Sequence, residues 1–243
     1  MSNKTKQMIK QKWIVGFIFT ITLTQSFAQN LKNQYDSDGK RHGLWTKNYY
    51  QTDQKRYEGE FKHGKEVDTF KYYRLNKGLS VLSAVKVFNE KDSLADVIFY
   101  ASNKKIISQG QMNGKRFKGK WIFYHNNSDG IMTIENYNND GQLHGERLVY
   151  YKNGAIAEKS SYNNGKLEGL YEWFTENKVL LRVSNYTNGQ LNGTTTNYHA
   201  NGEKVSEGLY KNDEKVEIWD YYENGILTKK IDHTNQKVIE KHD

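Results

Sequence analysis

A turn signal recurs every 24 residues along the second half of this chain. It comprises Asp140–Gly141, Asn164–Gly165, Asn188–Gly189 and the degenerate pair Asn212–Asp213. Four positions after each signal stands a second glycine or an acid, followed by an aromatic-rich run: Gly145, Gly169, Gly193 and Glu217. A fixed period of this length is typical of repeat proteins, in which each unit is one supersecondary structure that packs on its neighbours. The period therefore constrains the fold more strongly than any local propensity.

The same signal extends upstream with lower fidelity. Asp38–Gly39, His63–Gly64, Asn113–Gly114 and Asp140–Gly141 are separated by 25, 50 and 27 residues. The gap of 50 residues fits two units, with the hidden turn near residues 87–91. We expect about eight units at residues 35–233, irregular at 75–111. A linker at 29–34 precedes this array, and a polar C-terminal tail at 234–243 follows it.

Each unit is predicted to be a β-hairpin. In the unit that begins at Gly141, residues 146–151 and 156–162 have the composition of strands and are bounded by Asp-Gly and Asn-Gly turns. These dipeptides favour the type I′ turn, because both of its central residues need positive φ. The absence of proline from all 243 residues suits paired strands, since proline cannot donate to a ladder. The predicted fold class is all-β: an elongated single-layer antiparallel meander of hairpins, without long helices after the N-terminal segment.

Aromatic residues recur at fixed positions of this repeat. Residues two and four positions after the second glycine share one face of their strand, because side chains alternate between faces. The return strands add Tyr162, Tyr186 and Tyr210 at intervals of 24 residues. We favour a role for the rings as the packing face of the sheet, and the alternative is an exposed surface that stacks sugars or peptide side chains. The candidate binding residues are Trp45, Phe70, Trp121, Phe123, Tyr171, Trp173, Trp219 and Tyr221.

The first 28 residues do not belong to the array. Four lysines without an acid precede an uncharged apolar stretch from Trp13 to Leu23, and Ser26-Phe27-Ala28 offers small residues before a cleavage site. This pattern predicts a signal peptide at 1–28, because the apolar stretch is short for a membrane span. An uncleaved N-terminal anchor is the alternative. We expect an exported protein, periplasmic, cell-surface or secreted, with no transmembrane span after cleavage.

Composition argues against several functional classes. The predicted signal carries four of the 36 basic residues and none of the 28 acidic ones, which leaves a net charge of +4. Charges of both signs are interspersed, so no nucleic-acid partner is expected. The absence of cysteine excludes disulfides, thiol catalysis and thiolate metal sites.

No residue pattern indicates a metal site, a cofactor or catalysis. His42 and His144 both directly precede the second glycine of their units, so repetition explains them better than metal binding. Glutamates such as Glu146, Glu168 and Glu172 occupy ordinary repeat positions, whereas acid–base catalysis needs one special site. We therefore expect neither an enzyme nor a metal or cofactor site.

Residues 57–65, Tyr-Glu-Gly-Glu-Phe-Lys-His-Gly-Lys, resemble the core of a MORN repeat, Tyr-x-Gly-x-Trp/Phe-x-x-Gly-Lys, and residues 207–212 echo it. The other units resemble variant MORN repeats of bacterial proteins, many of them grouped as antitoxin-like. This resemblance covers nearly all of the mature chain. It implies an elongated sheet of hairpins, generally without an active site, and roles in membrane attachment, phosphoinositide binding, scaffolding or toxin binding. An exported chain cannot neutralise a cytoplasmic toxin, and bacterial envelopes generally offer no phosphoinositide pool, so neither activity transfers easily.

The expected function is that of an exported, non-enzymatic β-repeat protein whose surface binds a protein partner or an envelope component. Open sheet edges also predict an edge-to-edge homo-oligomer, since unpaired ladders recruit partners. Two alternatives remain: an antitoxin or immunity-type protein that binds a toxin, and a glycan-binding module that uses the aromatic ladder.

Overall fold

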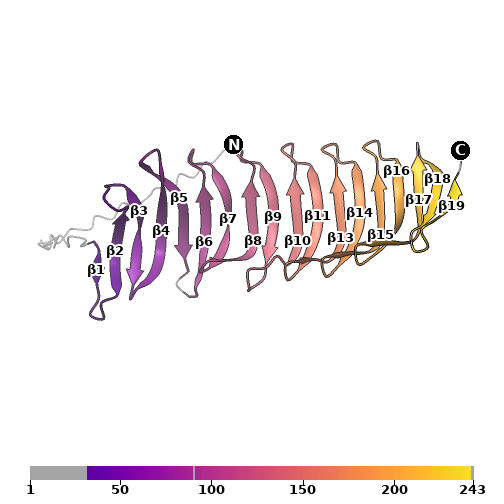
Figure 1. The fold of residues 1–243 in the computed structure, drawn as a ribbon. Coiled ribbons are helices and arrows are strands. Elements are labelled where there is room, and N and C mark those ends of the chain that lie inside the picture. The colour runs from indigo at the N-terminus through magenta and orange to yellow at the C-terminus, as the bar shows by residue number, and fades with distance from the viewer. Residues whose placement is uncertain (1–31, 90, 242–243) are drawn as a thin grey trace, which may run out of the picture. The chain divides into compact units, whose positions relative to one another are not determined.

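The computed structural model describes residues 32–89 and 91–241, so the predicted signal peptide at 1–28 lies outside the described residues. The described part contains 19 β-strands and no helix. The strands form one antiparallel sheet in which consecutive strands pair in chain order (Figure 1). The short strand β12 is a local exception, because β11 pairs with both β12 and β13. The predicted all-β meander is thereby confirmed.

The first nine strands are β1 (Gln34–Tyr35), β2 (Arg41–Asn48), β3 (Lys55–Lys62), β4 (Lys65–Asn76), β5 (Leu79–Phe88), β6 (Leu94–Tyr100), β7 (Ile106–Asn113), β8 (Arg116–Tyr124) and β9 (Ile131–Tyr137). The next five are β10 (Gly145–Tyr150), β11 (Ile156–Asn163), β12 (Lys166–Leu167), β13 (Gly169–Phe174) and β14 (Leu180–Thr187). The last five are β15 (Gln190–Tyr198), β16 (Lys204–Lys211), β17 (Glu214–Glu223), β18 (Ile226–Asp232) and β19 (Lys237–Lys241).

The hairpins match the predicted repeat, with two differences. Eight hairpins pair β2 with β3, β4 with β5, β6 with β7, β8 with β9, β10 with β11, β13 with β14, β15 with β16 and β17 with β18. Residues 75–111, expected to be irregular, continue the ladder through β4 to β7. The predicted polar tail contains β19, which pairs with β18. Backbone pairing accounts for this extension, because a polar segment can bond to an open strand edge as well as an apolar one.

Some of the predicted turns have positive φ at both residues of the signal, and others have it only at the glycine. Asn164 and Gly165 have φ values of 49° and 83°, the pair of angles that a type I′ turn needs. At Asp140–Gly141 and Asn153–Gly154 only the glycine has positive φ, so the type I′ prediction is wrong for these two turns. Side chains stabilise a different geometry there: Asn138 Oδ1 accepts the N–H of Asp140 at 3.0 Å, as in an Asx turn.

The second glycine of each repeat lies at a β-bulge. Gly169 and Gly193 have φ values of 79° and 117°, and the acids at the equivalent positions, Asp68 and Glu217, also have positive φ, at 54° and 58°. The ladder changes register opposite this position, for example between Ser184 and Tyr186 where β14 pairs with β15. Two steps on β14, from Ser184 to Tyr186, oppose four on β15, from Thr195 to Leu191, so β15 carries extra residues and forms a bulge. Glycine adopts the required φ at the lowest cost.

Large rings are buried flat against return-strand glycines. Three rings, each 0 % exposed, face one glycine apiece: Phe70 faces Gly59, Trp121 faces Gly110 and Trp219 faces Gly208. A Cβ added at these glycines would lie 2.5, 2.6 and 2.3 Å from the nearest ring atom. Neighbouring rings cover the other side, as where Phe117 stacks on Trp121 with a centroid separation of 3.8 Å. A single-layer sheet thus buries its aromatic residues without a second layer.

The core contains three groups of buried rings, and Phe88 packs against both the first and the second. The first contains Trp45, Phe61 and Phe70 on β2 to β4. The second contains Ala95, Val97, Met112 and Trp121. Partly buried rings on β5 to β9 pack against it: Phe88, Phe99, Phe117, Phe123 and Tyr137. In the third, Tyr210 and His233 lie edge-on to Trp219 on β16 to β18 and beyond. On the strands between the second and third groups the same face carries polar side chains such as Ser184 and Thr195, beside the ring pair Tyr171–Tyr186.

Candidate functional site

The eight predicted binding residues differ widely in exposure. Trp45, Phe70, Trp121 and Trp219 are 9, 0, 0 and 0 % exposed, respectively. Phe123, Tyr171 and Tyr221 are half-buried, and Trp173 is 46 % exposed. The four buried rings pack within the sheet and present no free face to a ligand. A binding role for the aromatic face therefore depends on Trp173 and on the half-buried rings.

Arg147 occupies the repeat position where Trp121 and Trp219 stand in other units. Its Nε donates to Glu135 Oε1 at 3.0 Å, and its Nη1 donates to Glu158 Oε1 at 2.7 Å. The side chains of Arg147, Glu135 and Glu158 are 24, 14 and 22 % exposed. Guanidinium–carboxylate hydrogen bonds are charge-assisted and hold both partners in a defined geometry. This trio replaces an aromatic cluster in the middle of the sheet.

Tyr171 belongs to the same network. Its hydroxyl donates to Glu158 Oε2 at 3.4 Å. Burial, followed by the negative charge of Glu158, raises the pKa of Tyr171 to about 12. The tyrosine therefore remains a neutral hydrogen-bond donor at physiological pH, which suits a binding surface and gives no base or nucleophile.

A second polar group follows on the next strands. Ser184 and Thr195 are both 0 % exposed, and Thr195 Oγ1 donates to Ser184 Oγ at 3.0 Å. Arg182 Nε donates to the same serine hydroxyl at 2.8 Å. Ser184 occupies the repeat position that Gly208 occupies in the next unit, and Thr195 occupies the position of Trp219. A small threonine side chain thus replaces the indole ring. The hydroxyl groups satisfy each other, so the buried polar atoms do not carry an unpaired desolvation cost.

Trp173 is the exposed centre of this region. On β11 its paired residue is Glu158, and on β14 its paired residue is Arg182. Trp173 therefore has a glutamate and an arginine as its cross-strand neighbours on one face of the sheet. We call the set Glu135, Arg147, Glu158, Tyr171, Trp173 and Arg182 the central polar patch.

The glutamates considered for acid–base chemistry have structural contacts. Glu168 Oε2 accepts the backbone N–H of Asn188 at 2.9 Å, which closes a turn. Glu172 lies 3.7 Å from the Lys159 ammonium across the strand pair. Both contacts join neighbouring segments of the sheet, so these two glutamates have a structural role.

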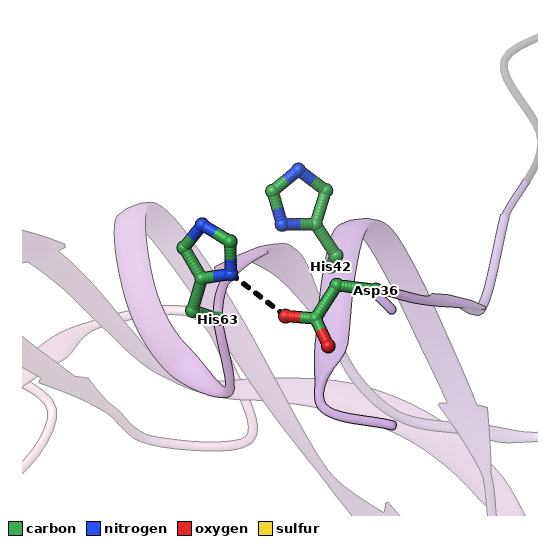
Figure 2. Close-up of side chains that lie close together, drawn as sticks. All are labelled: Asp36, His42 and His63. Atoms are coloured by element: carbon green, nitrogen blue, oxygen red, sulfur yellow. Dashed lines mark hydrogen bonds and ion pairs between the residues drawn. The ribbon is translucent and has the colours of Figure 1, made fainter. Parts of the chain in front are cut away.

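One cluster in the described residues has the composition of a metal site, although the sequence indicated none. Asp36 lies between β1 and β2, His42 lies on β2, and His63 lies in the turn between β3 and β4 (Figure 2). The ligand atoms that the three residues offer all lie within 4.8 Å of one another. Asp36 Oδ2 and His63 Nδ1 are 2.7 Å apart, and the imidazole centroids of His42 and His63 are 5.1 Å apart.

Asp36 is held in place by its own turn. Its Oδ1 accepts the backbone N–H groups of Asp38 at 3.0 Å and of Lys40 at 2.8 Å. The hydrogen bond from the Lys40 backbone, together with the one from His63, keeps the pKa of Asp36 below its usual value. Oδ2 remains directed to the histidine, so the carboxylate is ionised and oriented.

Sequence spacing could not reveal this cluster, because Asp36 and His63 are 27 positions apart and meet only when neighbouring hairpins pair. A comparison of the whole repeat, rather than of histidines alone, is the signal that would have found the cluster.

Comparison with known protein families identifies part of the array. Residues 143–164, 167–190 and 191–212 match the MORN repeat variant. These three consecutive repeats include Arg147, Glu158, Tyr171, Trp173 and Arg182 of the central polar patch. No curated protein sequence matched the chain. Within the described residues no helix is long and apolar enough to cross a membrane.

MORN repeats are commonly protein-binding or membrane-binding units and are generally non-catalytic, which is consistent with a non-enzymatic repeat protein. The matched segments each contain one β-hairpin junction of the sheet. The comparison thereby supports the repeat and its hairpin architecture over residues 143–212.

Proposed function

We propose that this chain is an exported, non-enzymatic repeat protein that binds another protein, or a component of the cell envelope, through the central polar patch. The observation that carries this proposal is the exposure of Trp173, 46 % of whose surface is open, between residues of opposite charge. Tryptophan, tyrosine and arginine are the residues most enriched at the energetic centres of protein interfaces. All three types converge here on one face of the sheet.

The surrounding network makes this surface preorganised. Arg147 is held by two carboxylates, and Arg182 is held by the Ser184 hydroxyl. Side chains that are already fixed lose less conformational entropy when a partner binds. A partner that presents an apolar side chain with flanking charges would fit the indole, the carboxylate and the guanidinium together. Export rests on the N-terminal charge and apolar pattern, and the periplasm, cell surface or medium is the proposed location.

The chain offers a matched control for this surface on the same strand. Trp173 and Leu170 both lie on β13, where their odd spacing places them on opposite faces, and they are 46 and 50 % exposed. The immobilised protein should retain a specific envelope protein or component, identified by mass spectrometry. Trp173→Ala should abolish this retention, and Leu170→Ala should leave it unchanged. Equal retention by both variants, with both folded by circular dichroism, would contradict the assignment of the binding face.

A glycan-binding module is the second candidate, because the exposed Trp173 ring also suits stacking on a sugar. Retention on polysaccharide columns that is lost in Trp173→Ala would favour it over a protein partner. An antitoxin-like role requires a cytoplasmic chain. Recovery of unprocessed full-length protein in the cytoplasm would therefore favour toxin binding and count against export.

We also propose that copies associate edge to edge. In the described part of the chain β1 pairs only with β2. This first strand thus has one ladder side available for β-strand addition. Light scattering at increasing concentration should show species larger than a monomer, and a strictly monomeric protein at high concentration would refute this assembly.

A further inference from the structure

We propose that Asp36, His42 and His63 form a binding site for a divalent transition metal, with Zn²⁺ as the probe. Two imidazoles and one carboxylate are ligands that Zn²⁺ commonly takes, and three protein ligands leave one position for water. The site lies on the first hairpins, away from the central polar patch, and does not depend on the proposed binding function.

The repeat itself provides the comparison that supports this site. Asn138, His144 and Asn164 occupy the equivalent positions four hairpins later, beside β10 and β11. In both places the backbone is built the same way: Gly64 N–H donates to Arg41 O at 2.8 Å, and Gly165 N–H donates to Leu143 O at 2.8 Å. The turn before the histidine also matches, with Asp36 N–H bonded to Lys40 O at 2.8 Å and Asn138 N–H bonded to Gln142 O at 2.9 Å.

The side chains differ where metal chemistry would require it. In the later copy Asn138 Nδ2 donates to Asn164 Oδ1 at 2.8 Å, an amide pair. In the first copy the same contact is the 2.7 Å pair between Asp36 Oδ2 and His63 Nδ1. An amide pair closes the repeat equally well, so structure alone does not need a carboxylate and an imidazole. Both replacements convert weak ligands into strong ones, beside a histidine that is present in both copies.

The geometry permits coordination after small side-chain movements. Ligand atoms at about 2.0–2.1 Å from tetrahedral Zn²⁺ are about 3.3 Å apart, and the three present here lie within 4.8 Å. The His42 side chain is exposed, and the His63 side chain is 61 % exposed, so both rings can rotate toward the ion. Asp36 is 9 % exposed and is fixed by two backbone N–H groups, which makes it the rigid ligand. Coordination through His63 Nδ1 requires the neutral imidazole to carry its proton on Nε2, in place of the existing hydrogen bond to Asp36.

Calorimetric titration of the untagged full chain with Zn²⁺ tests this site. We expect one ion per chain, and His42→Asn should lower the affinity by at least about 10-fold, as loss of even an outer-shell partner typically does. His144→Asn is the matched control, because this exposed histidine holds the same repeat position without a carboxylate or a second imidazole. It should bind Zn²⁺ as the wild type does. Circular dichroism shows that each variant is folded.

A graft provides the converse test. Asn138→Asp combined with Asn164→His recreates the three ligand types around His144 and should raise the stoichiometry from one ion to two. Unchanged affinity in His42→Asn, or a stoichiometry that stays at one in the grafted chain, would overturn the inference that these three repeat positions bind a metal.

Discussion

The pairing of Gly208 with Trp219 gives the sharpest quantitative test of how this sheet is held together. The indole is 0 % exposed and lies flat on the glycine, and its Nε1 donates to Leu209 O at 3.0 Å. Alanine at position 208 would place Cβ 2.3 Å from Trp219 Cδ2. Carbon atoms in contact prefer about 3.5–4.0 Å, so the ring must move by about 1 Å or more.

The expected cost follows from two contributions. Overpacking of a well-packed site costs about 1–3 kcal/mol. Displacement of the indole also weakens a hydrogen bond with a net value of about 1 kcal/mol. Gly208→Ala should therefore destabilise the protein by about 2–4 kcal/mol. Gly130→Ala is the control, because its nearest neighbour is the flexible Ser128 Oγ at 3.3 Å and its φ is ordinary; it should cost less than about 0.5 kcal/mol.

The array contains its own compensated version of this contact. Ser184 and Thr195 stand at the same junction between hairpins and are joined by a hydrogen bond of 3.0 Å. Gly208→Ser together with Trp219→Thr should copy this pair. Because the clash disappears with the ring, the double variant should lose at least about 2 kcal/mol less than the sum of the two single variants.

Urea unfolding followed by circular dichroism measures these differences, and amide hydrogen exchange locates them. Repeats contact only their neighbours, so protection should fall in β16 to β18 and stay unchanged in β2 to β4. A Gly208→Ala protein as stable as the wild type, or additive effects in the double variant, would refute the proposed coupling between ring and glycine.

Three further outcomes are expected from urea unfolding. Arg147→Ala should lower the free energy of unfolding by about 2 kcal/mol, because it leaves two partly buried carboxylates without their partner. Lys55→Ala, in an exposed ion pair, should lower it by less than about 1 kcal/mol. Equal losses would contradict the role of burial. Glu217→Gly should stabilise the protein by about 0.5–1 kcal/mol, since Glu217 has a φ of 58°, and a loss of stability would show that its side chain has another role. Burial, followed by repulsion from Lys215, lowers the pKa of His233 in the folded state, so the unfolded chain takes up more protons and stability is lost as pH falls below about 6.5. His233→Gln should flatten this dependence of stability on pH between pH 7 and pH 5. An unchanged slope would argue against a contribution from His233.

The local elements of the fold were predictable because they depend on local chemistry. Asn-Gly turns require positive φ, and alternating side chains require strands, so the hairpins and their number follow from residues close in sequence. The glycine four positions after each turn signal was visible in the sequence, but the sequence did not show that this glycine lies at a bulge. Turns such as Asp140–Gly141 were assigned the wrong type, because the Asn138 side chain decides the geometry from outside the dipeptide. The last strand, β19, was missed because its apolar residues, Val238 and Ile239, are adjacent and do not alternate with polar ones.

The candidate sites depended on contacts between units. Trp173 was identified from its repeat position, but only the paired strands place it between Glu158 and Arg182 and leave it exposed while Trp121 is buried. Trp121 lies against Gly110 of the preceding strand, whereas Trp173 has Glu158 as its partner there.

The sequence by itself determined an all-β array of hairpins with a period of 24 residues, because turn residues and side-chain alternation act over a few positions. Only the tertiary structure decided which rings are core, where Arg147 replaces a ring, and that Asp36 meets His63. Those features arise from the register between strands, which brings together residues far apart in the chain and selects among side chains that look equivalent in a repeat.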